Sequence, residues 1–186
     1  SLFRLHDGEL IETVLMRYES DGHRRNRKTA CISTQAGCAL GCTFCATGQQ
    51  GFRRNLTVGE IVGQVIAMQR TARAEDEAQI AQGKRTRGEL QGVTNVVFMG
   101  MGEPLHNIDV LLQALLILSA PWGLGISGRR ITVSTVGLVP EMRRLLEGSR
   151  VNLAVSLGAT TEDSRRELMP VTRKWSLASL LDECRT

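Results

Sequence analysis

Several common features are missing from this 186-residue sequence. No apolar run is long enough to cross a membrane, and the first residues form no charged-then-apolar leader. No GxGxxG pattern follows the first predicted strand, which argues against a dinucleotide-binding domain. No short-period repeat or second compositional unit is visible. We therefore expect one globular domain that acts in the cytoplasm without a membrane partner.

The cysteines are few and unevenly placed. Of the five, three fall within eight residues as Cys38, Cys42 and Cys45, in the stretch "QAGCALGCTFCATG". An odd number of cysteines without an export signal argues against a disulfide framework and favours a metal or redox site. No histidine follows at the interval that a zinc finger needs.

The spacing C-x3-C-x2-C supplies one thiolate fewer than a tetrahedral structural zinc site requires. A [4Fe-4S] cubane bound by three thiolates keeps one iron open for a non-protein ligand. Gly37, Gly41 and Gly48 would let the loop backbone fold around such a cluster. Zinc remains an alternative if Cys31 or Cys184 supplies a fourth ligand.

Apolar strands alternate with amphipathic helices along the chain. Strands are predicted at residues 29–34, 93–100, 130–135 and 151–157. Helix-start signals follow them as a Thr57–Glu60 capping box, Asn107 and Pro140. Residues 71–92 predict a helix extension that runs into an exposed insertion, and a last helix places Cys184 at a core position. The alternation indicates an α/β fold with parallel strands, either an open sheet or part of a (β/α) barrel.

Polar residues gather where the predicted strands end, which is where such folds place their active sites. The cysteine loop follows the first strand, and Gly102 and Glu103 lie in a Gly-Glu-Pro turn after the second. Ser134 and Ser156 end the third and fourth strands. An alternative role for Glu103 is purely structural: its negative charge would stabilise the N-terminus of a helix.

Two further residues stand out within predicted strands. Cys31 lies inside the first apolar strand, where most lone cysteines are small buried hydrophobes. Glu12, in "LIETVLM", shares a strand face with Leu10, Val14 and Met16. Its carboxylate is therefore either exposed at the edge of the sheet or buried and held by specific polar partners.

Four segments together carry a resemblance to a known family: "CISTQAGCALGCTFCATGQQGFRRNLTVGEIVGQV", "VVFMGMGEPLHN", "ITVSTVGLVPEM" and "NLAVSLGATTEDSRRELMP". They resemble radical S-adenosylmethionine (SAM) enzymes, and among them the dual-specificity RNA methyltransferases that methylate C2 of adenine in 23S ribosomal RNA and in tRNA. The likeness spans roughly residues 10–182. It implies a partial (β/α) barrel of the radical SAM type, truncated at its C-terminal end.

The resemblance implies that Cys38, Cys42 and Cys45 hold a [4Fe-4S] cluster, with SAM on the fourth iron. The residues implied to contact SAM are Gly102, Glu103, Ser134, Ser156, Leu157 and Gly158. Members of the family commonly have histidine at the last of these positions, so only a backbone contact is expected there.

The resemblance also implies a reaction through a methyl-cysteine intermediate and a 5′-deoxyadenosyl radical. Glu12 would accept the C2 proton, and Cys31 would release the product by forming a disulfide with the methyl-carrying cysteine, which is expected beyond Thr186. Residues 1–27 would form an N-terminal strand and basic linker, and residues 28–186 an incomplete radical SAM core. Without an RNA-binding domain and the C-terminal part of the core, we expect no complete methyl transfer by this chain alone.

The implied partners are 23S rRNA, tRNA and a reductant such as flavodoxin or ferredoxin. Basic residues in "HRRNRK" (23–28) and at Arg53 and Arg54 are expected to border the cysteine loop and contact RNA. Three alternatives stay open: the C8-methylating, antibiotic-resistance branch of the family, a radical SAM activase or maturase, and a non-catalytic metal-binding fragment.

Overall fold

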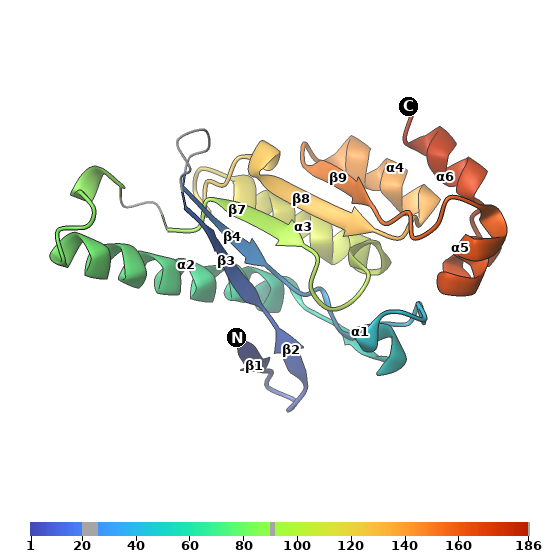
Figure 1. Cartoon of the computed structure of the whole chain (residues 1–186), viewed down its shortest axis with the longest axis horizontal. Coiled ribbons are helices and arrows are strands. Elements are labelled where there is room, and N and C mark those ends of the chain that lie inside the picture. The colour runs from blue at the N-terminus through green and yellow to red at the C-terminus, as the bar shows by residue number, and fades with distance from the viewer. Residues whose placement is uncertain (20–25, 90–91, 186) are drawn as a thin grey trace.

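A five-stranded sheet forms the centre of the computed structural model, which describes residues 1–19, 26–89 and 92–185 (Figure 1). The strand order is β3-β4-β7-β8-β9. The strands are β3 (Val14–Tyr18), β4 (Arg27–Cys31), β7 (Asn95–Phe98), β8 (Ile131–Thr135) and β9 (Asn152–Val155). All pair in parallel except β3, which is antiparallel to β4. The predicted α/β fold with parallel strands is confirmed, and the sheet is open within the described residues.

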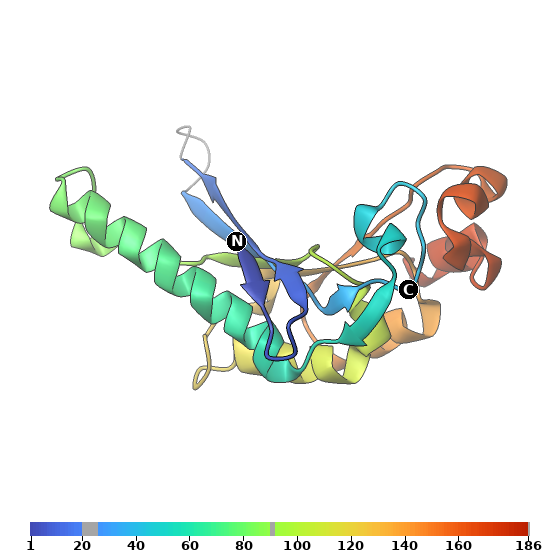
Figure 2. The same cartoon turned by 90° about the horizontal axis from the view of Figure 1, so that it is seen from below.

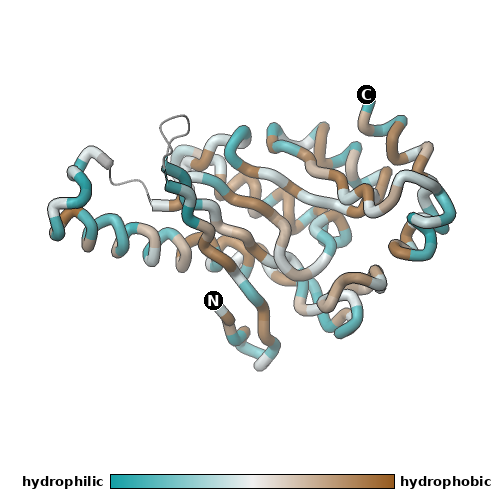
Figure 3. The backbone as a smooth tube through the Cα atoms, viewed as in Figure 1, coloured by the Kyte–Doolittle hydropathy of each residue, from teal (hydrophilic) through white to brown (hydrophobic). Residues whose placement is uncertain are grey.

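Helices α2 (Val58–Ala81), α3 (Ile108–Ser119) and α4 (Val139–Gly148) follow one another along one face of the sheet (Figure 2). Thr57 forms the predicted capping box with Glu60 at the start of α2. The far end of α2 projects beyond the sheet and is mostly hydrophilic, whereas the central strands are hydrophobic (Figure 3). Among the described helices, none combines the length and apolar character needed to cross a membrane.

Shorter elements complete the described fold. Two small hairpins pair β1 (Leu2–Arg4) with β2 (Leu10–Glu12), and β5 (Gln35–Gly37) with β6 (Phe52–Asn55). The remaining α-helices are α1 (Ala46–Gln49), α5 (Glu162–Leu168) and α6 (Leu177–Glu183). Four 3-10 turns are η1 (Arg87–Glu89), η2 (Pro104–Asn107), η3 (Gly128–Arg130) and η4 (Pro170–Arg173).

Some local predictions were wrong in detail. Cys184 is exposed and follows the last residue of α6, because this short helix buries Leu180 and Glu183 rather than a continuous stripe. Asn107 precedes α3 without capping it, since its side chain donates instead to the carbonyl of Leu56 at 2.8 Å. The segment predicted as one strand, "LIETVLM", is divided between β2 and β3 at Thr13.

Candidate functional site

The loops at the carboxyl ends of the parallel strands surround one pocket of about 300 Å³. The sequence-predicted residues that line it are Cys38, Cys42, Cys45, Gly102, Glu103, Ser134 and Ser156. They come from the loops that follow β4, β7 and β9 and, for Ser134, from the last residues of β8. The parallel order of these strands brings the loops to one edge of the sheet, as the sequence analysis anticipated.

The cysteine loop is closed by the β5–β6 hairpin. Gly37 pairs with Phe52, and the Cys38 N–H donates to the Gly51 carbonyl at 3.1 Å. Gly37 has φ +74°, and a Cβ atom there would lie 1.8 Å from the Gly51 oxygen, so no other residue fits. The residue type thus fixes the base of the loop that presents the thiols.

Three thiols converge on the pocket without forming a mononuclear site. Cys42 is buried, and Cys38 and Cys45 are half-buried. Burial raises the pKa of the Cys38 and Cys42 thiols, and the charges of neighbouring cysteines and of Glu103 raise it further. Within the described residues, no group of three or more His, Cys, Asp or Glu side chains is arranged to hold a single metal ion.

This donor set fits an iron-sulfur cluster better than a single zinc ion. In a cubane each thiolate binds a different iron, so the sulfur atoms need not meet at one centre. The pocket has room beside the thiols, and the loop supplies three ligands from eight residues. Neither Cys31 nor Cys184, one of which the zinc alternative needs as fourth ligand, is among the residues that line it.

Glu103 is buried in the pocket wall and hydrogen-bonded there. Its side chain is 3% exposed and accepts hydrogen bonds from the N–H groups of Leu105 and Val136, each at 3.1 Å. Burial raises the pKa of this carboxyl group, whereas the hydrogen bonds that it accepts lower it. Glu103 therefore caps the η2 turn and also lines the pocket, so the two roles considered from the sequence are compatible.

Buried polar side chains that the sequence analysis did not single out hold the loops together. Gln35 accepts from the Glu103 N–H at 2.8 Å and donates to Asn55 at 2.8 Å. Ser33 donates to the Glu12 carbonyl at 2.7 Å and accepts from the Met101 N–H at 2.8 Å. Their signal in the sequence was a run of polar residues, "STQ", directly after an apolar strand.

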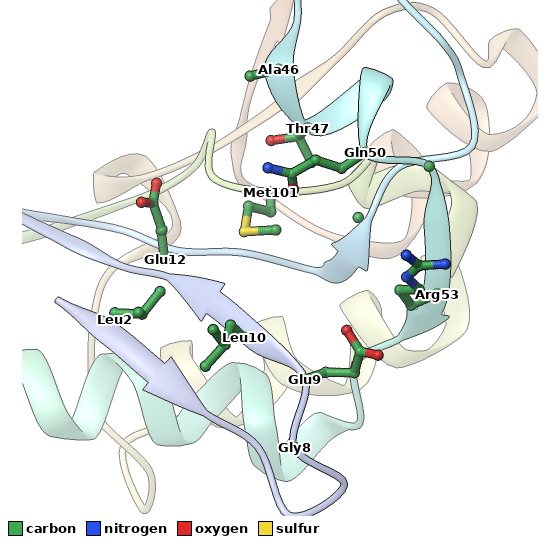
Figure 4. A pocket seen from close by; sticks show the side chains of 12 residues that line it. Leu2, Gly8, Glu9, Leu10, Glu12, Ala46, Thr47, Gln50, Arg53 and Met101 are labelled. Carbon is green, nitrogen blue, oxygen red and sulfur yellow. The ribbon is translucent and has the colours of Figure 1, made fainter.

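A second pocket, of about 670 Å³, lies beside the first and contains Glu12 (Figure 4). Thr47 lines both pockets, and Met101 lies between Glu12 and Arg53 in the close-up view. The Glu12 side chain is exposed, whereas its neighbours Ile11 and Thr13 are fully buried on the opposite face. Of the two positions that the sequence allowed for this carboxylate, the structure selects the exposed one.

Cys31 lies at the carboxyl end of β4 and is half-buried. It pairs with Val14 of β3, so its side chain shares a face with Val14. Burial raises the pKa of the Cys31 thiol, and a hydrogen bond with the Met99 backbone partly offsets this. It lines neither of the two pockets. All five cysteines are free thiols.

Leu157 and Gly158 lie just outside the pocket lining. The Leu157 carbonyl accepts a hydrogen bond from the buried side chain of Arg165 at 2.9 Å. Gly158 has φ +74°, and a Cβ atom there would lie 2.5 Å from the Met169 sulfur. Arg165 itself gave no signal in the sequence, because arginine in a polar helical stretch is normally exposed.

Only some of the basic residues expected to border the cysteine loop lie near it. Residues 23–25 lie outside the described residues, and Arg27 and Lys28 begin β4 at the end opposite the loop. Arg54 is bound to Glu60 through two hydrogen bonds of 2.8 Å and also to Asp7. Arg53 is exposed and lines the second pocket. Lys28 therefore does not border the cysteine loop, and both Lys28 and Arg54 already pair with carboxylates. Arg53 is the basic residue for which an RNA contact stays the stronger prediction.

The family described as the Radical SAM superfamily matches residues 32–182. The chain is 49% identical over 185 residues to "Dual-specificity RNA methyltransferase RlmN 1" of Myxococcus xanthus, and 50% identical over 184 residues to "Dual-specificity RNA methyltransferase RlmN" of Syntrophotalea carbinolica. Each match covers 99% of this chain, which spans 46% and 43% of those proteins. The crystal structure of a radical SAM methyltransferase from Sphaerobacter thermophilus aligns with a TM-score of 0.84 and 45% identity, covering 99% of this chain and 48% of that one.

Proposed function

Because this chain belongs to the radical SAM superfamily, we propose that it is the core of an RNA methyltransferase that acts on C2 of adenine in 23S rRNA and tRNA. The observation that carries the proposal is the pocket in which three thiols meet Glu103 and two strand-end serines. The identity of about half of all residues with two dual-specificity RNA methyltransferases supports the substrate class.

Cys38, Cys42 and Cys45 would hold the cluster, and the free side of the pocket would take SAM. When bound, the cluster supplies one electron that cleaves SAM to a 5′-deoxyadenosyl radical. Glu103 would face the ammonium group of SAM, because a buried carboxylate compensates a cation strongly. Ser134 and Ser156 would contact the rest of SAM. Leu157 and the backbone of Gly158, which follow Ser156 in the chain, would extend this contact.

The second pocket would take the target nucleotide. Glu12 is exposed there and would accept the proton from C2. Arg53, on the same pocket, would contact a phosphate group of the RNA. Cys31 would form the transient disulfide that releases the product, from the sheet face that Val14 also occupies.

The remaining parts of the proposal concern partners and setting. A small reductant such as flavodoxin or ferredoxin would deliver the electron, in the cytoplasm. Residues 1–27 would connect the core, residues 28–186, to an RNA-binding domain. The methyl-carrying cysteine would lie outside this chain, so we expect the chain alone to release no C2-methyladenosine from rRNA.

Metal analysis after anaerobic reconstitution is the first test. We expect about four iron and four sulfide per chain, as a cubane requires. Cys42→Ala should abolish cluster loading, whereas Cys184→Ala should not, because Cys184 is exposed and outside the pocket. Bound zinc, or full iron loading of Cys42→Ala, would refute the cluster.

A chimera tests the reaction itself. This chain would replace the matching segment of the Myxococcus xanthus relative, to which it is 49% identical. With SAM, reductant and 23S rRNA, the chimera should produce C2-methyladenosine, and Glu12→Gln should reduce its yield strongly. Methylation at C8 would assign the chain to the other branch, and cleavage of SAM without RNA methylation would favour an activase.

A further inference from the structure

The largest fully buried side chain in the described part of the protein belongs to a cation, Arg165 of α5. Only 1% of this residue is exposed. Its Nε donates to the Leu157 carbonyl at 2.9 Å and its Nη1 to the Thr172 hydroxyl at 2.6 Å. Its Nη2 donates to the carbonyls of Val136 and Ser156. All four acceptors are neutral groups.

No carboxylate forms an ion pair with Arg165 among the described residues. Glu162 acts on it at longer range, but the Glu162 carboxylate pairs with Arg166 and accepts from the Leu177 N–H at 2.7 Å. Burial lowers the pKa of Arg165, whereas the charges of Glu162 and Cys42 raise it. A buried cation without a direct counterion is costly, so an anion close by would offset a large penalty.

This charge lies directly behind the wall of the cysteine pocket. Val136 and Ser156, two of the Arg165 acceptors, line the pocket, and so does Met169, whose N–H donates to the Arg165 carbonyl at 2.7 Å. The pocket lining includes Glu103 and three cysteines but no lysine or arginine in the described part of the chain. Once the thiols are ionised, the pocket is strongly negative and Arg165 is the cation behind it.

A nearby positive charge stabilises thiolates and also stabilises an added electron. Reduction of a cluster by one electron adds one negative charge, and no bond forms or breaks. Hydrogen bonds and net charge around a cluster set its reduction potential. Three of the four acceptors directly follow β8 or β9, and the fourth, Thr172, lies in η4, so Arg165 ties together the two strand ends that face the pocket.

We propose that Arg165 is a positioning residue that compensates the negative charge of the cluster from behind the pocket wall and thereby raises its reduction potential. The same charge strengthens binding of SAM by offsetting the carboxylate of its methionyl group. This inference rests on the proposed cluster and SAM site. It adds a residue that touches neither ligand but sets the electrostatics of both.

The first test compares Arg165→Lys, which keeps the charge, with Arg165→Gln, which removes it. Both lose the guanidinium fork, so a scaffolding role alone predicts equal effects. We expect iron loading in both, a more negative midpoint potential in Arg165→Gln, and a SAM dissociation constant about tenfold higher than in Arg165→Lys. Arg166→Gln is the matched control, because Arg166 is exposed and paired with Asp163.

A second pair keeps Arg165 and changes its neighbour, in case neither first variant folds. Thr172→Asp places a carboxylate against Nη1, which now contacts the hydroxyl at 2.6 Å, and Thr172→Asn places a neutral group of the same shape there. The midpoint potential should be more negative in Thr172→Asp than in Thr172→Asn. Equal potentials and equal SAM affinities within each pair would overturn the inference.

Refutation of the role of Arg165 can be distinguished from refutation of the proposed function. If the wild-type chain takes up no iron, the proposed function fails before Arg165 is tested. If the wild-type cluster forms and binds SAM but the charge-changing variants match their controls, only the role of Arg165 is refuted. Thermal unfolding of the metal-free variants reports separately on any loss of structure.

Discussion

Arg53 and Arg54 are adjacent on β6, and their surroundings differ completely. Successive side chains of a strand point to opposite sides, so one arginine faces Glu60 and Asp7 while the other faces the second pocket. The sequence presents the two as equivalent basic residues. Only the pairing of β6 with β5, and the position of α2 behind it, separates the proposed RNA contact of Arg53 from the ion pair of Arg54.

RNA binding should therefore respond to one of these arginines and not to the other. Arg53→Ala should weaken binding to an rRNA fragment and flatten its salt dependence, since one phosphate contact is lost. Arg54→Lys keeps the charge and should leave both the affinity for the rRNA fragment and its salt dependence unchanged. Filter binding at several salt concentrations measures the slope, and a normal slope for Arg53→Ala would remove Arg53 from the RNA site.

Arg54 should instead contribute to stability, in a pH-dependent manner. Its hydrogen bonds hold the pKa of Glu60 at about 2, below the ordinary value of 4.5. A lowered pKa stabilises the folded state above pH 4.5, and this contribution disappears as the pH falls from 4.5 through 2. Arg54→Ala should lose about 1–2 kcal/mol of unfolding free energy at neutral pH. In urea titrations the difference should shrink below pH 4.5, and a difference that grows on acidification would contradict the assignment.

At the scale of elements, the cysteine loop depends on the hairpin that closes it. The β5–β6 pairing brings Gly37 against Gly51 and has a register shift between Ala36 and Gly37. The sequence predicted a loop with permissive glycines, but not which of them is indispensable. A Cβ atom added at Gly37 would meet backbone atoms, whereas one added at Gly41, which has φ +62°, would meet no atom within 4 Å.

Alanine at these two glycines should have unequal effects. Gly37→Ala places its Cβ 1.8 Å from a carbonyl oxygen, so the hairpin must open and both cluster loading and stability should fall sharply, by about 3 kcal/mol or more. Gly41→Ala meets no atom within 4 Å and should cost only about 1 kcal/mol for its positive φ. Iron content and thermal unfolding measure the two effects. Equal iron loading in both variants would show that the hairpin does not determine the conformation of the cysteine loop.

At the scale of the whole molecule, the two ends of the sheet have different tasks. The carboxyl ends carry the two pockets, whereas the amino end of β4 carries a buried ion cluster. There Asp76 of α2, fully buried, accepts from Lys28 at 2.7 Å, from Arg85 at 2.6 Å and from the Gly92 N–H at 3.0 Å. This cluster fastens the long helix to the sheet, away from the proposed chemistry.

Removing the buried carboxylate should therefore affect folding and not the metal site. Asp76→Asn leaves the buried Lys28 with only the more distant Glu75 carboxylate, at 3.7 Å, and should cost about 3–5 kcal/mol of stability. Glu75→Gln is the comparison on the same helix: Glu75 pairs with Arg17, touches Lys28 only at 3.7 Å and is partly exposed, so its loss should cost less than about 1 kcal/mol. Folded Asp76→Asn should still load iron normally. Loss of iron loading in a variant that is as stable as the wild type would contradict the separation of this ion cluster from the metal site.

The sequence alone determined the alternation of parallel strands and helices, the cysteine loop and the strand-end residues around it. These follow from local patterns: apolar periodicity, capping residues and cysteine spacing report directly on neighbouring positions in the chain. Tertiary structure decided which of the charged residues are held by partners within the fold and which face a pocket. Arg53 and Arg54 have the same chemistry, and Arg165 resembles any exposed helical arginine, until residues distant in sequence supply their partners. The environment of a charge depends on groups brought together by folding, and no pattern within one segment records them.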